Sequence, residues 1–178
     1  MAEQLDFDYL AEAPSMPRKR EFEVDVIRSK KRRKTAQAKL VGNRLEVRIP
    51  AHSSKSHETE LVTYFVAKFQ RAADSSELDL PKRAAELANT YGLRTPSSIR
   101  WVSNQKGRWG SCTPSDGTVR LSDRLARFPI WVIDYVIIHE LSHLHVSGHG
   151  PDFWRLVEQY PKTERARGFL IAQSWQDE

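Results

Sequence analysis

The spacing of apolar residues changes along the chain, and each change predicts a different kind of element. Over residues 21–50 apolar and charged positions alternate, with Val24 and Val26 on either side of Asp25, a pattern typical of half-buried strands. Gly42 and Asn43 separate two further apolar runs and form a turn signal. The segment therefore predicts a small antiparallel sheet.

Two helices are expected between residues 54 and 92. Leu61, Tyr64 and Phe65 have the i, i+3 and i+4 spacing of one helix face. The second helix is expected to begin near Pro81, because proline is favoured in a first helical turn, and to stop at the glycine that closes the segment.

Residues 99–121 return to short alternating runs separated by turn residues, which predicts further strands. From Ile130 to about His145 nearly every position is apolar, as in a buried helix. Further helices are expected from about Pro151 and over roughly residues 162–174. This order of strands and helices indicates an α+β fold, with small antiparallel sheets packed against the apolar helix.

Composition narrows the class of protein. Hydrophobic residues make up 39% and charged residues 29% of the 178, as in an ordinary globular domain. The single cysteine rules out an intrachain disulfide, and no apolar run approaches the roughly 20 residues that span a bilayer. The acidic N-terminus does not resemble a signal peptide. We expect a cytoplasmic protein with no membrane partner, consisting of a flexible tail over residues 1–20 and one domain over residues 21–178.

The apolar helix carries a metal-binding motif. His139 and His143 are four residues apart, so their imidazoles project from one helix face and can share a tetrahedral zinc ion. Glu140 borders that ion and can take a proton from the zinc-bound water. Zinc lowers the pKa of such a water to around 7, which makes hydroxide available at neutral pH. The motif therefore predicts zinc-dependent hydrolysis of peptide bonds, with Glu140 as the general base.

A third ligand is expected just beyond the helix. His149 follows Gly148, which permits a tight turn back toward the metal. His145 lies about 200° around the helix from His143, so it faces away if the helix continues. We therefore expect His149 to be the ligand. Val146 stands where the related His-Glu-x-x-His-x-x-Gly-x-x-His pattern has its turn glycine, so a different turn is implied.

Several motifs occur together in this chain. They are Arg108-Trp109-Gly110-Ser111-Cys112, Ile133-Asp134-Tyr135-Val136, His139-Glu140-Leu141-Ser142-His143-Leu144, and His149 with Phe153-Trp154. This combination, over nearly all of residues 22–175, resembles the YgjP-like metallopeptidase family, which is similar to the SprT and WLM zincins. The resemblance implies a zincin-like α+β fold and a peptide or protein substrate. It also implies a Zn²⁺ ion held by His139, His143 and His149, with Glu140 as the catalytic residue.

A substrate-binding strand is expected beside the metal, since zincin-like folds pair an edge strand with an extended substrate. Either residues 108–112 or residues 118–122 are candidates for that strand. Arg108, Trp109 and Gly110 are the candidate substrate-binding residues, and the glycine would allow a close backbone approach. Core packing explains Trp109 equally well. Cys112 is better explained as a small buried apolar residue than as a thiolate ligand.

The sequence gives weaker indications of which residues orient the histidines and stabilise the reaction. Asp134 and Asp152 are candidates to accept a hydrogen bond from a metal-bound histidine, although solvated surface charge explains both equally well. Arg108, His145 and Tyr135 are candidates to stabilise the oxyanion.

The net charge of +5 arises in one segment. Residues 18–34 hold nine Lys or Arg and three Asp or Glu, so the remaining residues sum to −1. The candidate phosphate-binding residues within positions 28–34 are Lys30, Lys31, Arg32, Arg33 and Lys34. Some SprT and WLM proteins are linked to repair of DNA–protein crosslinks, so the alternative function is a nucleic-acid-associated zinc protease or a DNA-binding zinc protein. A charged strand edge that discourages aggregation also explains the run.

A non-catalytic zinc module is the third interpretation. Structural zinc sites fill all four coordination positions with protein ligands. Only three good ligands are visible here, and Glu140 is present, so we rank this interpretation last.

Overall fold

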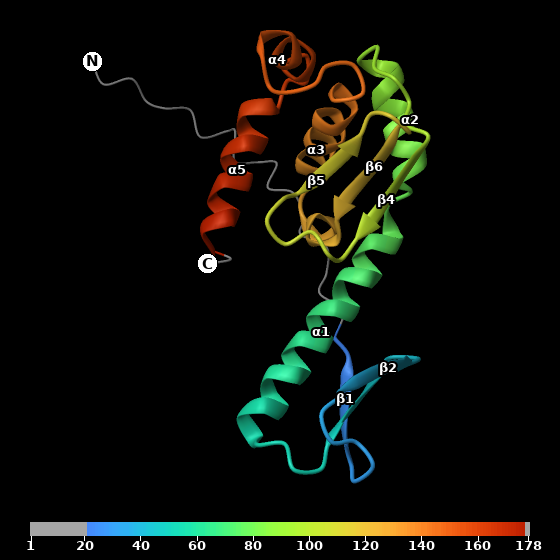
Figure 1. The fold of residues 1–178 in the computed structure, drawn as a ribbon, viewed down its shortest axis with the longest axis vertical. Helices are drawn as coiled ribbons and strands as arrows, with labels where there is room; N and C mark the ends of the chain where they lie inside the picture. Colours follow the sequence, from blue (N-terminus) through green and yellow to red (C-terminus); the bar gives the residue numbers. More distant parts are fainter. Residues whose placement is uncertain (1–20, 177–178) are drawn as a thin grey trace, which may run out of the picture.

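A long helix links two hydrophobic cores in the computed structural model, which describes residues 21–176 (Figure 1). The smaller core lies between the first sheet and the helix α1 (Lys55–Glu77), and the larger core holds the second sheet and the remaining helices. The tail predicted over residues 1–20 lies outside the described residues. No helix in the described part of the chain is long and apolar enough to cross a membrane.

The first sheet is mixed, so the prediction of an antiparallel sheet is wrong in this detail. Its strands are β1 (Glu23–Ser29), β2 (Gln37–Val41) and β3 (Arg44–Pro50), in the order β1-β3-β2. A tight turn with Gly42 at φ 62° pairs β3 antiparallel to β2, and β3 then runs parallel to β1. The longer connection between β1 and β2 leaves room for β3 to enter between them.

Alternate residues of β3 form the centre of the smaller core. Leu45, Val47 and Ile49 are fully buried and pack with Phe65 of α1. Two positions from the predicted apolar faces do not join them, because Val24 and Tyr64 are 40% and 55% exposed. The strand and helix periodicities were therefore predicted correctly, but not every apolar residue is buried.

The second sheet is also mixed, with one central strand between two edge strands. Its strands are β4 (Ser98–Val102), β5 (Gly110–Thr113) and β6 (Thr118–Ser122), in the order β4-β6-β5. β4 is parallel and β5 antiparallel to the central β6. Ile99, Val119 and Leu121 point from one face of this sheet into the larger core.

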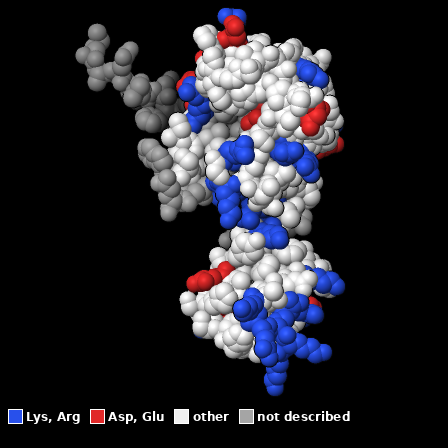
Figure 2. Space-filling view, in the orientation of Figure 1, with Lys and Arg blue, Asp and Glu red and all other residues white. Residues whose placement is uncertain are grey.

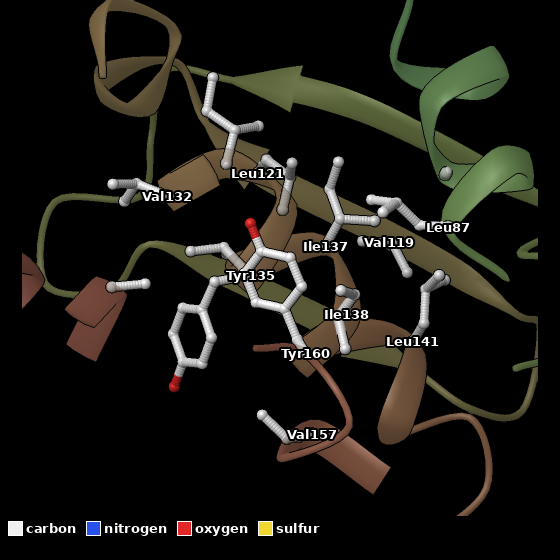
Figure 3. Packing of buried hydrophobic residues seen from close by; sticks show 14 of the residues in the cluster. Leu87, Val119, Leu121, Val132, Tyr135, Ile137, Ile138, Leu141, Val157 and Tyr160 are labelled. Atoms are coloured by element: carbon white, nitrogen blue, oxygen red, sulfur yellow. The ribbon is translucent and has the colours of Figure 1, made fainter. Parts of the chain in front are cut away.

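Helix α3 (Ile130–Ser142) forms the centre of the larger core and is buried on nearly all sides, as its composition predicts. Figure 3 shows its side chains Tyr135, Ile137, Ile138 and Leu141 among residues of β6, α2 and α4. The helices around it are α2 (Leu80–Thr90), α4 (Pro151–Val157) and α5 (Thr163–Gln176), and a 3₁₀ turn, η2 (Asp123–Arg127), precedes it. The predicted α+β fold is therefore confirmed.

Candidate metal centre

Helix α3 and the loop that follows it bring three imidazoles together. His139 lies in the last turn of α3, His143 caps that helix, and His149 comes from the loop before α4. One nitrogen from each of the three rings lies within 4.8 Å of the other two. The Nε2 atoms of His139 and His149 are 3.2 Å apart. Two nitrogens bound to one tetrahedral zinc would be separated by about 3.3 Å, so these residues fit a zinc ion.

The loop after α3 fixes the orientation of its histidines. The Val146 carbonyl lies 3.3 Å from Nδ1 of His143, so an Nδ1–H donor would leave Nε2 of that ring free for a metal. Gly148 has φ 78° and provides the turn that returns the chain to the site. The fully buried Phe153 stacks on His143 with ring centroids 4.4 Å apart. At the position where the related pattern has its turn glycine, this chain therefore has Val146, whose backbone carbonyl faces the His143 ring.

Burial keeps the helical imidazoles neutral, which is the form that binds metals. Burial lowers the pKa of His139 to about 3, with a further contribution from the neighbouring His143 and His149. Burial also lowers the pKa of His143. The Nδ1 atom of His139 is buried and has no hydrogen-bond partner among the described residues.

His145 is not part of this cluster. It is exposed, and its Nε2 accepts a hydrogen bond from the backbone N–H of Arg94 at 2.8 Å. The structure therefore brings His149 to the other two rings, as expected, and turns His145 toward the loop before β4.

Glu140 lies between the metal cluster and the edge strand β5. Its side chain is buried, and a Cβ atom added to Gly110 would lie 2.5 Å from the Glu140 Oε1 atom. The missing side chain at Gly110 therefore allows the backbone of β5 to lie close to Glu140, the candidate general base. Burial raises the pKa of Glu140 to about 7, and the positive charge of Arg108 partly opposes this shift.

Two cavities meet around Glu140 and form a cleft along β5. One of about 260 Å³ has an apolar wall that includes Trp109, Tyr135 and Leu170. The other, of about 380 Å³, contains the three histidines and Ser111. Arg108, Gly110, His139 and Glu140 line both cavities. Because β6 is the central strand, residues 118–122 are not an edge strand. The other candidate, residues 108–112, overlaps the edge strand β5, and substrate pairing there stays a prediction.

Comparison with known proteins identifies the family. The family model described as the YgjP-like metallopeptidase domain matches residues 9–171. The chain belongs to the YgjP-like metallopeptidase family. Membership confirms the resemblance seen in the motifs and the predicted peptidase activity, and it implies a bound metal ion. A search of curated proteins finds no match.

Two solved structures of metallopeptidase zymogens are similar to this YgjP-like protein. The match to the zymogen of Pyrococcus abyssi abylysin covers 53% of this chain and 93% of the abylysin chain. It has 26% sequence identity and a TM-score of 0.47. The match to the zymogen of Methanocaldococcus jannaschii jannalysin covers 54% of this chain and 97% of the jannalysin chain. It has 20% sequence identity and also a TM-score of 0.47.

Trp109 and Cys112 have packing roles in the YgjP-like chain. The Trp109 ring packs on Phe128 at 5.3 Å between centroids, and the guanidinium of Arg124 lies 4.2 Å above it. Cys112 packs against the larger core, and burial together with the charge of Glu140 raises the pKa of its thiol to about 11. Cys112 also lies outside the cluster of potential metal ligands. A thiolate ligand is therefore disfavoured.

The two candidate aspartates bond to arginines and not to the histidines. Asp134 receives two hydrogen bonds from Arg83 of α2, at 2.7 and 2.6 Å. Asp152 forms an exposed ion pair with Arg155 at 3.0 Å. The sequence did not indicate the carbonyl of Val146, because a backbone acceptor leaves no signal in residue type.

The basic segment lies in the connection between β1 and β2, at the end of the molecule opposite the metal cluster (Figures 1 and 2). Arg28 donates to Glu58 of α1, and Arg32 donates to Gln37 at 2.6 Å, so both have structural partners. Lys30, Lys31, Arg33 and Lys34 are exposed. The family match gives no support for a nucleic-acid partner, and binding by this segment stays a prediction.

Proposed function

We propose that this protein is a zinc peptidase whose metal is held by His139, His143 and His149 and whose general base is Glu140. The observation that carries the proposal is the meeting of three histidine nitrogens, within 4.8 Å of one another, beside a buried carboxylate at an open strand edge. Three protein ligands leave a fourth position for water or substrate, as catalytic zinc sites do. This arrangement favours a catalytic site over a purely structural one.

The chain's own residues supply the positioning and the proton transfer. Zinc, when bound, supplies Lewis-acid chemistry that activates water and polarises a carbonyl. An extended substrate would pair with β5, which places its backbone over Glu140. Glu140 would take a proton from the attacking water and pass it to the leaving amine. Arg108 and Tyr135 line the same cleft and are the remaining candidates to stabilise the oxyanion.

Substitutions of the histidines and Glu140 test this proposal. Glu140→Gln should keep the zinc and lose about a hundredfold or more of the hydrolysis rate on unfolded protein, because the general base is removed. His149→Ala should lose the zinc, measured by elemental analysis after gel filtration. His145→Ala is the matched control and should keep both zinc and activity. Full zinc content in His149→Ala, or no hydrolysis by the zinc-loaded wild-type protein, would contradict the proposal.

A further inference from the structure

A basic hollow lies on the outer face of the second sheet, the face turned away from α3. It has a volume of about 730 Å³, and none of the described residues that line it carries a carboxylate. Its charged lining residues are Arg100, Lys106, Arg108 and Arg120. Figure 2 shows Lys and Arg gathered over this face of the sheet. The hollow is therefore suited to an anion.

Strand register places two of these arginines side by side. Arg100 of β4 is paired with Arg120 of β6, which is paired in turn with Ser111 of β5. Both arginines are exposed, and neither forms an ion pair with any residue that the structure describes. Like charges directly opposite each other on neighbouring strands destabilise a sheet. A bound anion would offset that repulsion.

Asp116, in the turn between β5 and β6, does not fill this role. Hydrogen bonds from Thr118 lower the pKa of its carboxyl, and the charge of Arg120 adds a smaller contribution. Its Oδ1 atom accepts hydrogen bonds from the backbone N–H and the hydroxyl of Thr118, at 2.9 and 2.7 Å. Asp116 is therefore held in its own turn, outside the lining of the hollow.

The hollow continues into the cleft of the metal centre. Arg108, Ser111 and Cys112 line both the hollow and the cavity that contains the histidines. A polypeptide bound along the edge strand β5 would direct alternate side chains to the two faces of the sheet. One set would face the metal cluster, and the other would face the basic hollow.

We propose that the hollow is a subsite for acidic side chains, Asp or Glu, of the polypeptide substrate. This inference rests on the proposed function, because it assumes a peptide along β5. The surface is better suited to carboxylates than to nucleic acid, since single-stranded nucleic acid binds to basic grooves that also present aromatic rings for base stacking. None of the described residues that line the hollow is aromatic.

Peptide binding to the zinc-loaded Glu140→Gln protein tests the subsite without requiring hydrolysis. The probes are labelled short peptides that alternate alanine with glutamate, glutamine or lysine, and affinity is measured by fluorescence anisotropy. The glutamate peptide should bind about tenfold more tightly than the glutamine peptide, since each arginine of an exposed ion pair contributes about two- to fivefold. High salt should remove the preference.

Variants of the two paired arginines identify the source of the preference. Arg120→Ala should lower it about two- to fivefold, and Arg120→Glu should shift it toward the lysine peptide. Arg100→Ala should lower it less, because β4 lies one strand farther from a peptide on β5. Lys82→Ala, an exposed position on α2, removes the same charge elsewhere and should leave the preference unchanged.

Three results would overturn the inference. They are equal binding of the glutamate and glutamine peptides, a preference that both alanine variants retain in full, and displacement by a single-stranded oligonucleotide where the acidic peptide does not bind. An acid preference that depends on the two arginines, found in a protein that hydrolyses no peptide, would instead defeat the proposed function and leave the subsite intact.

Discussion

A methyl group at position 110 would occupy the space of the Glu140 carboxylate. A Cβ there would lie 2.5 Å from Oε1 and 2.8 Å from Cγ of Glu140, which is closer than real Cβ atoms approach other heavy atoms. The edge strand and the candidate general base therefore require a glycine at this point. At the residue scale, the missing side chain at one position of β5 therefore leaves room for the carboxylate that α3 contributes to the site.

Gly110→Ala should lower kcat/KM about a hundredfold, because Glu140 must move by roughly an ångström to make room. Zinc content should stay unchanged, since the three atoms nearest to the new methyl group all belong to Glu140 and not to a histidine. Gly168→Ala is the matched control, because a Cβ at that exposed position of α5 meets no atom within 4 Å. Wild-type activity in Gly110→Ala would show that Glu140 tolerates displacement.

Cys112 offers a test of the burial and charge around Glu140. Its thiol pKa is raised from 9.0 to about 11, mainly by burial and then by the charge of Glu140. Alkylation requires the thiolate, so iodoacetamide at pH 8 should react about a hundredfold more slowly than with the unfolded chain. The rate should rise as the pH approaches 11. Equal rates for folded and unfolded protein would contradict the buried placement of this thiol.

At the scale of elements, one charged pair joins α2 to α3. Asp134 is almost fully buried, with 6% of its side chain exposed, whereas 32% of the Arg83 side chain is exposed. The pair stabilises the packing of the two helices only while both partners are present, because a buried charge left alone is costly. When one partner is removed, water can solvate the remaining side chain well if it is Arg83 but poorly if it is Asp134.

Arg83→Met should lower the free energy of unfolding by about 3 kcal/mol, since it leaves a buried carboxylate without its cation. Asp134→Asn should cost only about 1 kcal/mol, because the arginine can reach solvent and the amide still accepts a hydrogen bond. Urea denaturation of the metal-free proteins measures both values. A larger loss in Asp134→Asn than in Arg83→Met would reverse this interpretation of the pair.

The whole molecule has two cores, and only the larger one lies beside the candidate metal ligands. The three histidines and Glu140 belong to α3 and the loop after it, beside the larger core. The smaller core around β3 holds none of these residues, and α1 connects it to the rest of the described structure (Figure 1). A ligand that binds the native state stabilises the part of the structure that it holds together.

Chelation of the metal should therefore raise amide hydrogen exchange at residues 139–153 and leave β1–β3 unchanged. The reason is that metal binding links the end of α3 to the loop before α4, and not to the first sheet. Mass spectrometry measures the exchange in both regions before and after chelation, and zinc added back is the control. Equal changes in residues 139–153 and in β1–β3 would show that the cores unfold as one unit.

The sequence by itself predicted the candidate metal ligands and the candidate general base, and it determined the class of fold and most of the helices. These features depend on residues close together in the chain: His139, Glu140 and His143 share one helical turn, and His149 follows within a short loop. Apolar periodicity also identified α3 as buried, because an all-apolar helix has no face for solvent. Local spacing is enough for inferences of this kind.

Only the tertiary structure decided how distant segments meet. Strand order made β5 an edge strand and β6 the centre, which left only one of the two candidate substrate-binding segments at an edge. The pairing of Asp134 with Arg83, and of Arg100 with Arg120, joins residues with no periodic relation in the chain. Such contacts depend on the packing of whole elements against one another, which hydrophobic periodicity does not specify.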